Sequence, residues 1–226
     1  NKSDLNNCYN IKNNYLRNNQ TGTGSGFILS IGGELAYDNN NNSSEITGNF
    51  IVGNNNSAGV HWLMCNCGIN NRLLFNKIIG SYYGIVVKTG TTAKSYTSGG
   101  VYGNVINCAQ GIRVKGVSGI NVYNNTIKGV TSAGIYCDEN NVIAGDQFSE
   151  NVIIKNNIIT GTAGSLILFD QHAADNGCIV QNNQLYGGLY LLTTGSTNYS
   201  DLVTAQAAGK LLGCVVDNPN LNLSLI

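Results

Sequence analysis

A short phrase built around asparagine recurs along the chain and constrains its fold more than any other feature. The phrase is a few apolar residues, one or two asparagines, two more apolar residues and usually a glycine, as in Val101-Tyr102-Gly103-Asn104-Val105-Ile106. Seven copies are anchored, at intervals of 35, 27, 28, 21, 32 and 26 residues, by Asn14, Asn49, Asn76, Asn104, Asn125, Asn157 and Asn183. Periods of about 20 to 50 residues are typical of solenoid proteins, whose repeats stack on one another.

A second phrase, glycine followed by branched apolar residues, comes several residues after most anchors. Copies are Gly59-Val60, Gly84-Ile85, Gly111-Ile112 and Gly134-Ile135, with a looser Ser165-Leu166-Ile167 in the sixth repeat. Each turn is therefore expected to hold at least two short strands, which form parallel sheets when turns stack about 4.8 Å apart. Asparagine suits the corner because it tolerates the left-handed backbone and because its amide can hydrogen-bond the equivalent amide one turn away.

The chain carries little charge. Its 226 residues include 37 Asn and 29 Gly, with 12 basic against 12 acidic side chains and 11% charged residues, where an average globular chain has about 25%. A neutral chain without Lys/Arg runs argues against nucleic acid as the main partner. No apolar run approaches the roughly 18 residues of a membrane helix, so membrane insertion is not expected. The seven cysteines form no CxxC pair and lie mostly in apolar contexts, so we expect free thiols that fill the core.

The repeats and their end predict the domain organisation. We expect a solenoid of about seven turns over residues 1–190 and a capping segment over 191–226, which covers the open end of the stack. In the cap, Ser200 is expected to begin a short helix over 201–208, and Cys214 to Val216 and the alternating Leu221, Leu223 and Leu225 are expected to form closing strands. The chain opens within a repeat and without a secretory signal, so we expect further turns, and any signal, upstream of residue 1.

With these repeats the chain resembles the right-handed parallel β-helix of the pectate-lyase superfamily. The resemblance covers about residues 5–190 and implies an all-β fold of the kind found in polysaccharide lyases, epimerases, phage tailspikes and NosD-like periplasmic proteins. It also implies a location outside the cell, on the cell surface or on a virion. One fold hosts many functions, so the activity has to be argued from the site.

Strand alternation predicts one exposed face that carries the charged residues. If the Ile or Val after each turn glycine points inward, the next residue and the one two further on point outward. The first outward row is then His61, Val86, Arg113, Tyr136 and Ile167. The second is Leu63, Lys88, Lys115, Asp138 and Phe169. Three of the 12 basic groups would thus gather in two adjacent turns.

The resemblance assigns a chemistry to this cationic face. β-Elimination from a uronate needs the carboxylate neutralised, a base for the C5 proton and an acid for the leaving oxygen. Lyases of this fold imply Lys88 or Lys115 as the base and Arg113 as the acid or carboxylate clamp, often with Ca²⁺ as cofactor. His61, Trp62, Tyr136 and Asp138 would contact the polysaccharide. The alternative is that these side chains only solvate an exposed sheet, and a register slip of one residue would turn the whole set inward.

Other clusters lead to weaker hypotheses. Asp138, Glu139, Asp146 and Glu150 supply oxygen ligands for Ca²⁺ without the spacing of an EF-hand. Asp170 and Asp175, which flank His172, would suit a glycoside hydrolase, a second choice behind a lyase. The main functional alternative is a non-catalytic glycan-binding or structural module, such as a tailspike or a cell-surface adhesin. The sequence leaves the oligomeric state open.

Overall fold

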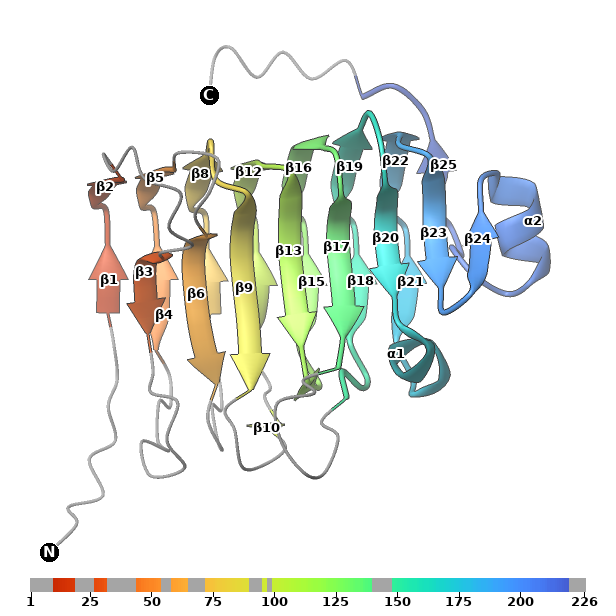
Figure 1. Ribbon diagram of the computed structural model, residues 1–226, viewed down its shortest axis with the longest axis horizontal. Helices are drawn as coiled ribbons and strands as arrows, with labels where there is room; N and C mark the ends of the chain where they lie inside the picture. Colours follow the sequence, from red (N-terminus) through yellow and green to blue (C-terminus); the bar gives the residue numbers. More distant parts are fainter. Residues whose placement is uncertain are drawn as a thin grey trace, which may run out of the picture.

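The computed structural model describes residues 10–18, 27–31, 44–53, 58–64, 72–89, 95–96, 99–139 and 148–219. Almost all of the regular structure is β-strand, arranged in three sheets that the chain visits in turn (Figure 1). Strands of each sheet lie side by side along the long axis, and their colours run from red to blue in that direction. We call one pass through the three sheets a coil and name the sheets A, B and C in the order in which the chain enters them.

Nearly every strand pairs in parallel with the equivalent strand of the next coil. Sheet A contains β1 (Asn10–Lys12), β4 (Glu45–Thr47), β7 (Arg72–Leu74), β11 (Gly100–Tyr102), β15 (Asn121–Tyr123), β18 (Ile153–Lys155) and β21 (Ile179–Gln181). Sheet B contains β2 (Tyr15–Arg17), β5 (Phe50–Val52), β8 (Lys77–Ile79), β12 (Val105–Asn107), β16 (Thr126–Val130), β19 (Ile158–Gly161), β22 (Gln184–Gly187) and β25 (Val215–Val216). Sheet C contains β3 (Phe27–Ile31), β6 (Ala58–Met64), β9 (Tyr83–Thr89), β13 (Gln110–Lys115), β17 (Ala133–Asp138), β20 (Ser165–Phe169), β23 (Tyr190–Thr194) and the antiparallel β24 (Thr197–Tyr199). The remaining elements are the short pair β10 (Ser95–Tyr96) and β14 (Val117–Ser118), and the helices α1 (Gln171–Asp175) and α2 (Leu202–Ala207).

The predicted anchor asparagines lie over one another at the corner between sheets A and B. From Asn49 onward, each one accepts hydrogen bonds at its Oδ1 from the backbone N and the side-chain Nδ2 of the preceding anchor. For Asn125, the donors are N and Nδ2 of Asn104, both at 3.0 Å. The same two bonds join every successive pair from Asn14 to Asn183, at 2.9–3.1 Å. Because each buried amide also donates to backbone carbonyls, as Asn125 does to Val101 and Tyr123, the polar column is satisfied inside the protein.

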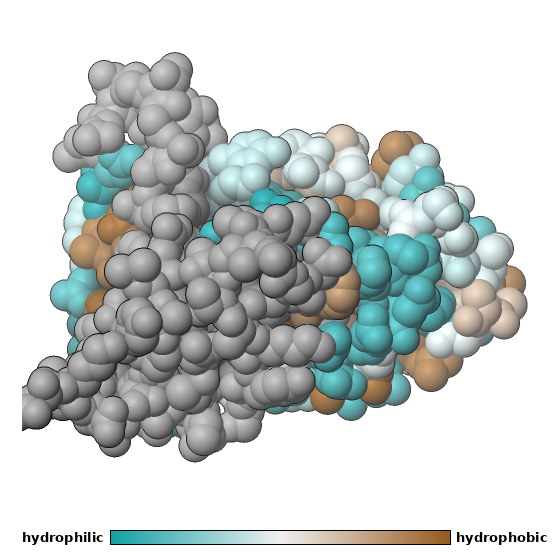
Figure 2. Space-filling view, turned by 60° about the horizontal axis from the view of Figure 1, so that its bottom comes forward, coloured by the Kyte–Doolittle hydropathy of each residue, from teal (hydrophilic) through white to brown (hydrophobic). Residues whose placement is uncertain are grey.

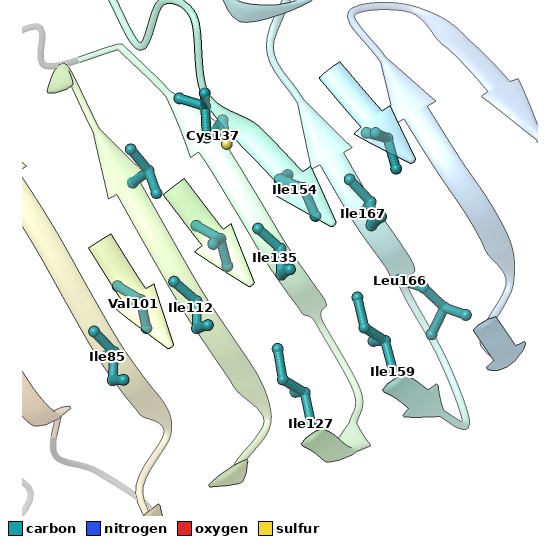
Figure 3. Close-up of a cluster of buried hydrophobic side chains, with 14 of the residues drawn as sticks. Ile85, Val101, Ile112, Ile127, Ile135, Cys137, Ile154, Ile159, Leu166 and Ile167 are labelled. Carbon is teal, nitrogen blue, oxygen red and sulfur yellow. The ribbon is translucent and has the colours of Figure 1, made fainter. Parts of the chain in front are cut away.

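Branched apolar side chains from all three sheets fill the interior. In Figure 3, Ile112 and Ile135 of sheet C and Ile127 and Ile159 of sheet B point into one continuous core. Each is fully buried. The strands are too short to bury a face alone, so the core exists only because coils stack. The inward positions predicted for Ile112 and Ile135 are thus confirmed.

The register in the sixth coil differs from the prediction by one residue. Ile135 pairs with Ile167, and Tyr136 pairs with Leu168. Ile167 is therefore a core residue, and Phe169 is also buried, so their predicted outward positions are wrong. The cause is that Leu166, not Ser165, occupies the position that glycine holds in the preceding coils.

The segment after residue 190 first adds strands to the stack of coils and then forms the cap. β23 pairs in parallel with β20, and β25 pairs with β22, so coil pairing runs past the predicted boundary at residue 190. Helix α2 forms where expected, but its N-cap is Asp201, whose carboxylate accepts from the backbone N of Thr204. The prediction of Ser200 as the cap was wrong by one residue. Leu221, Leu223 and Leu225 lie outside the described residues.

Cys214 takes the place of an asparagine in an eighth copy of the repeat. Its thiol accepts from the backbone N of Asn183 at 3.3 Å and lies 3.8 Å from the Nδ2 of the same residue. Gly213 before it has a φ of 65°, and Leu212 bridges to Gln181 of sheet A. The sequence Leu211-Leu212-Gly213-Cys214-Val215-Val216 therefore follows the phrase at 101–106, with sulfur in place of an amide oxygen.

Replacing Cys214 with asparagine is expected to stabilise the protein by about 1 kcal/mol, because a carbonyl oxygen accepts better than a thiol. The new amide would also have the carbonyls of Val180 and Leu212 in the positions that the other anchors use. Urea denaturation of Cys214→Asn and of the control Cys214→Ala, which has no acceptor, measures the effect. A Cys214→Asn protein less stable than the parent would contradict this account of the eighth copy.

The four described cysteines are free thiols, as predicted. Cys108, Cys137 and Cys214 are buried and Cys178 is half-buried. Burial raises the pKa of Cys108 to about 12 and that of Cys178 to about 11, so both stay protonated. In the part of the chain that is described, no helix is long and apolar enough to cross a membrane.

Candidate functional site

The outer face of sheet C brings the predicted cationic residues together. Lys88, Lys115 and Asp138 share one register position in three successive coils. Val86, Arg113 and Tyr136 share the position two residues earlier. The two predicted rows therefore share their register from the second coil to the fifth, and only Ile167 and Phe169, their members in the sixth coil, are misplaced. We call Lys88, Arg113, Lys115, Tyr136 and Asp138 the sheet C cluster.

Arg113 and Asp138 form an ion pair across adjacent coils. The Arg113 Nε lies 3.2 and 3.1 Å from the two carboxylate oxygens of Asp138, and Nη2 also donates to Oδ2. The side chains are 22% and 6% exposed, so the pair is largely withdrawn from water. Asp138 was predicted to contact substrate, but its carboxylate is committed to Arg113.

Two aromatic rings flank the Arg113 guanidinium, one from each neighbouring coil. Its Cζ lies 5.1 Å from the centroid of the Tyr136 ring and 5.9 Å from that of Tyr83, within the range of cation–π attraction. Tyr83 is not a member of the two predicted outward rows, because it has the alternation parity of the inward residues Ile85 and Val87. Arg113 is thus held by a carboxylate and two rings, an arrangement that fixes its position.

Burial is the largest influence on the pKa values of Asp138, Arg113 and Tyr136. Burial raises the pKa of the Asp138 carboxyl, although the hydrogen bonds and charge of Arg113 oppose this. Burial also works to lower the pKa of Arg113, but the hydrogen bond and charge of Asp138 outweigh it and raise that pKa. For Tyr136, burial and then the nearby Asp138 charge raise the pKa, so its hydroxyl keeps its proton. Arg113 is therefore a permanent cation and Tyr136 a proton donor.

Lys115 differs from the other cations in the cluster. Its pKa is lowered by burial first, and then by the positive charges of Arg113 and Lys88, while Asp138 acts in the opposite direction. Lys88 is half-buried beside it in the same register row. A lysine whose pKa is lowered loses its proton more readily, so Lys115 is suited to act as a general base.

The other predicted contact residues are placed by backbone register only. His61 pairs with Val86 and so continues the row of Arg113. Trp62 pairs with Val87, whose side chain is fully buried. The register therefore places His61 in the row of the cluster and Trp62 at a position that the next coil uses for its core.

The acidic groups beside the cluster are engaged in local structure. The Asp170 carboxylate caps α1 by accepting from the backbone N of Ala173, and its other oxygen accepts from the backbone N of Glu139 at 2.6 Å. Asp175 accepts from Gln171, and the His172 ring stacks on Phe148. Figure 2, which brings this side of the molecule forward, shows hydrophilic residues gathered over the part that carries α1. Since both oxygens of Asp170 have partners, the glycosidase hypothesis gains no support from these contacts.

Calcium has no fitting set of ligands among the described residues. Within them, no three His, Cys, Asp or Glu side chains group closely enough to hold a metal ion. Asp138, the first member of the predicted set, is bound by Arg113, and Asp146 lies outside the described residues. The calcium hypothesis stays a prediction.

Comparison of the chain with protein-family models, with curated proteins and with solved structures gives no match.

Proposed function

We propose that the three stacked sheets form a right-handed parallel β-helix of the pectate-lyase type. Three observations support it: the repeated A, B, C strand order, the parallel pairing of equivalent strands, and the buried asparagine column at one corner. Solenoids of this kind present long outer sheets on which residues from several coils combine into one surface.

We further propose that the protein acts outside the cell on an acidic, uronate-containing polysaccharide, in the manner of a lyase. The observation that carries this proposal is the sheet C cluster, in which a fixed cation, a lysine with a lowered pKa and a protonated tyrosine lie on adjacent coils. These are the three groups that β-elimination requires. Lys88 adds a second cation in the row of Lys115.

In this proposal, Lys88 neutralises the substrate carboxylate, an Arg113 N–H that Asp138 does not use donates a hydrogen bond to it, and both contacts acidify the C5 proton. Neutral Lys115 takes that proton, and the electron pair of the C5–H bond forms a C4–C5 double bond. The C4–O bond breaks, and the leaving oxygen takes a proton from Tyr136. Arg113 serves as the clamp and not the acid, because its guanidinium is held by Asp138 and keeps its charge.

A non-catalytic glycan-binding module is the second candidate, and one observation favours it. The Arg113–Asp138 pair cancels one positive charge of the cluster, which leaves Lys88 and Lys115 as its net cations. Two cations in register suit the binding of a polyanion without any reaction, as in a tailspike or an adhesin.

Lys115→Gln is expected to lower the elimination rate by about 10²- to 10⁴-fold, the usual contribution of a general base. Formation of the unsaturated uronate is followed by its ultraviolet absorbance, with alginate, polygalacturonate and dermatan sulfate as substrates. The rate of the parent should rise with pH as Lys115 loses its proton, and the lowered pKa moves that rise to lower pH. Lys128→Gln, which changes a half-buried lysine on sheet B, is the matched control.

An unchanged rate in Lys115→Gln would overturn the role of this lysine. Absence of product from all three substrates, together with binding to any of them, would favour the non-catalytic module.

A further inference from the structure

One corner residue breaks the pattern of its row. The position before each anchor has a positive φ in eight coils, between 53° and 65°: Asn13, Gly48, Phe75, Gly103, Asn124, Asn156, Asn182 and Gly213. Seven of them are Asn or Gly, the residues that tolerate this conformation. Phe75, at 53°, is the exception, and a bulky residue with positive φ is strained.

Packing in the core does not compensate for this strain, because the Phe75 side chain is 69% exposed. Its ring instead lies along the next coil, over Gly103. A Cβ on that glycine would lie 2.6 Å from two ring carbons of Phe75, so the ring needs the glycine beneath it. The Phe75 backbone N also donates to the carbonyl of Tyr102 at 3.1 Å.

Two further aromatic side chains lie on sheet A, in the two coils that follow the coil of Phe75. Tyr102 and Tyr123 share a register position in adjacent coils, and their ring centroids are 5.8 Å apart. Tyr102 lies over Gly100, where a Cβ would be 2.6 Å from its Cζ and hydroxyl. The Tyr123 hydroxyl donates to Asn121 Oδ1 at 2.8 Å, which fixes its ring. We call Phe75, Tyr102 and Tyr123 the aromatic strip.

The chemistry around the strip identifies what it would hold. The exposed Asn124 follows Tyr123 in the chain, and Lys155 shares the register position of Tyr123 in the next coil. Flat rings bordered by an amide and a cation match a pyranose chain that carries carboxylates. The apolar faces of the sugars would stack on the rings. The sugar hydroxyls and carboxylates would contact the amide and the cation. A nucleic acid would require more positive charge than Lys155 supplies, because the neighbouring Arg72 is paired with Glu45.

The strip is too small to be the interface with a second copy of the chain. Even complete burial of three aromatic side chains removes about 450–750 Å² from water. A stable interface buries about 800 Å² on each partner.

We propose that the aromatic strip is a stacking subsite for an acidic polysaccharide, separate from the sheet C cluster. The identity of the ligand as an acidic polysaccharide rests on the proposed function. The location of the subsite is inferred from the strained Phe75 and the aromatic side chains near it. Phe75 is retained at its strained corner because its ring contacts the ligand.

The substitution Phe75→Asn tests the proposal, because it restores the residue type of the other corners. It should raise the midpoint of urea denaturation, since Asn tolerates the positive φ. It should also weaken binding about three- to tenfold, the usual worth of one stacked ring. Binding is measured by affinity electrophoresis through gels that contain alginate, polygalacturonate or dermatan sulfate. A variant that gains stability while losing affinity cannot have lost it by unfolding.

Tyr102→Leu provides a second test of the strip and should also weaken retardation. The control is Tyr15→Leu, a 59% exposed tyrosine on sheet B, which should leave retardation unchanged. Equal retardation of the parent and Phe75→Asn, or no retardation of the parent in any of the gels, would overturn the proposal. Retardation that depends on Phe75 in a protein that forms no unsaturated product would support the strip while rejecting the lyase reaction.

Discussion

Replacement of Asn125 by alanine is expected to lower the free energy of unfolding by about 2–4 kcal/mol, because it interrupts the asparagine column inside the protein. Asn125 is fully buried, and its Oδ1 is the acceptor for the backbone N of Asn104. Without it that N–H has no partner and no access to water. The Nδ2 of Asn104 is less affected, because it also donates to the carbonyls of Leu73 and Tyr102.

Urea denaturation followed by circular dichroism measures the loss. The matched control is Asn124→Gly, one residue earlier, where the side chain is exposed and the φ of 57° suits glycine. This control should change stability little. Equal stability of Asn125→Ala and Asn124→Gly would show that the column adds nothing to the fold.

Gly111→Ala is expected to cost about 3 kcal/mol, at the upper end of what overpacking usually does. A Cβ at this position would lie 2.4 Å from the Gly134 carbonyl oxygen and 2.5 Å from Ile127 Cγ2. Neither atom is the free end of a flexible side chain, so adjacent coils would have to move apart. The shift would also displace Arg113 and Lys115 on the same strand.

The control for this glycine is Gly209→Ala, where a Cβ would meet no atom within 4 Å but φ is +70°. It should cost only the conformational strain, about 1–2 kcal/mol. The prediction fails if thermal or urea denaturation shows Gly111→Ala to be no less stable than Gly209→Ala.

The sequence was sufficient to predict features that repeat and insufficient where one coil departs from the others. The anchors were found because an asparagine column requires the same residue in every coil. Cys214 was not recognised as an anchor because a thiol replaces the amide at the last position. The error at Ile167 has the same origin: Leu166 stands where four earlier coils have glycine, so alignment on glycine slipped by one residue.

The sequence was sufficient to predict that the residues of the sheet C cluster lie close together. It was not sufficient to predict which of their side chains form an ion pair. Stacking alone places Lys115 beside Asp138 in the same row. Arg113 nevertheless pairs with Asp138 diagonally, because its long side chain spans both the coil spacing and two positions along the strand. Burial, which decides this pairing and the lowered pKa of Lys115, depends on the three-dimensional surroundings and has no signature in the spacing of residues.

The unequal anchor intervals show where this architecture can vary in length. From Asn104 to Asn125 the chain closes a full coil in 21 residues, whereas Asn14 to Asn49 takes 35, and the same pair of amide hydrogen bonds joins the anchors in both cases. The extra length of the longer coil is divided between the connection from sheet B to sheet C and the connection from sheet C to sheet A. This scaffold can therefore accept segments of different size and chemistry between its sheets while the asparagine column stays unchanged.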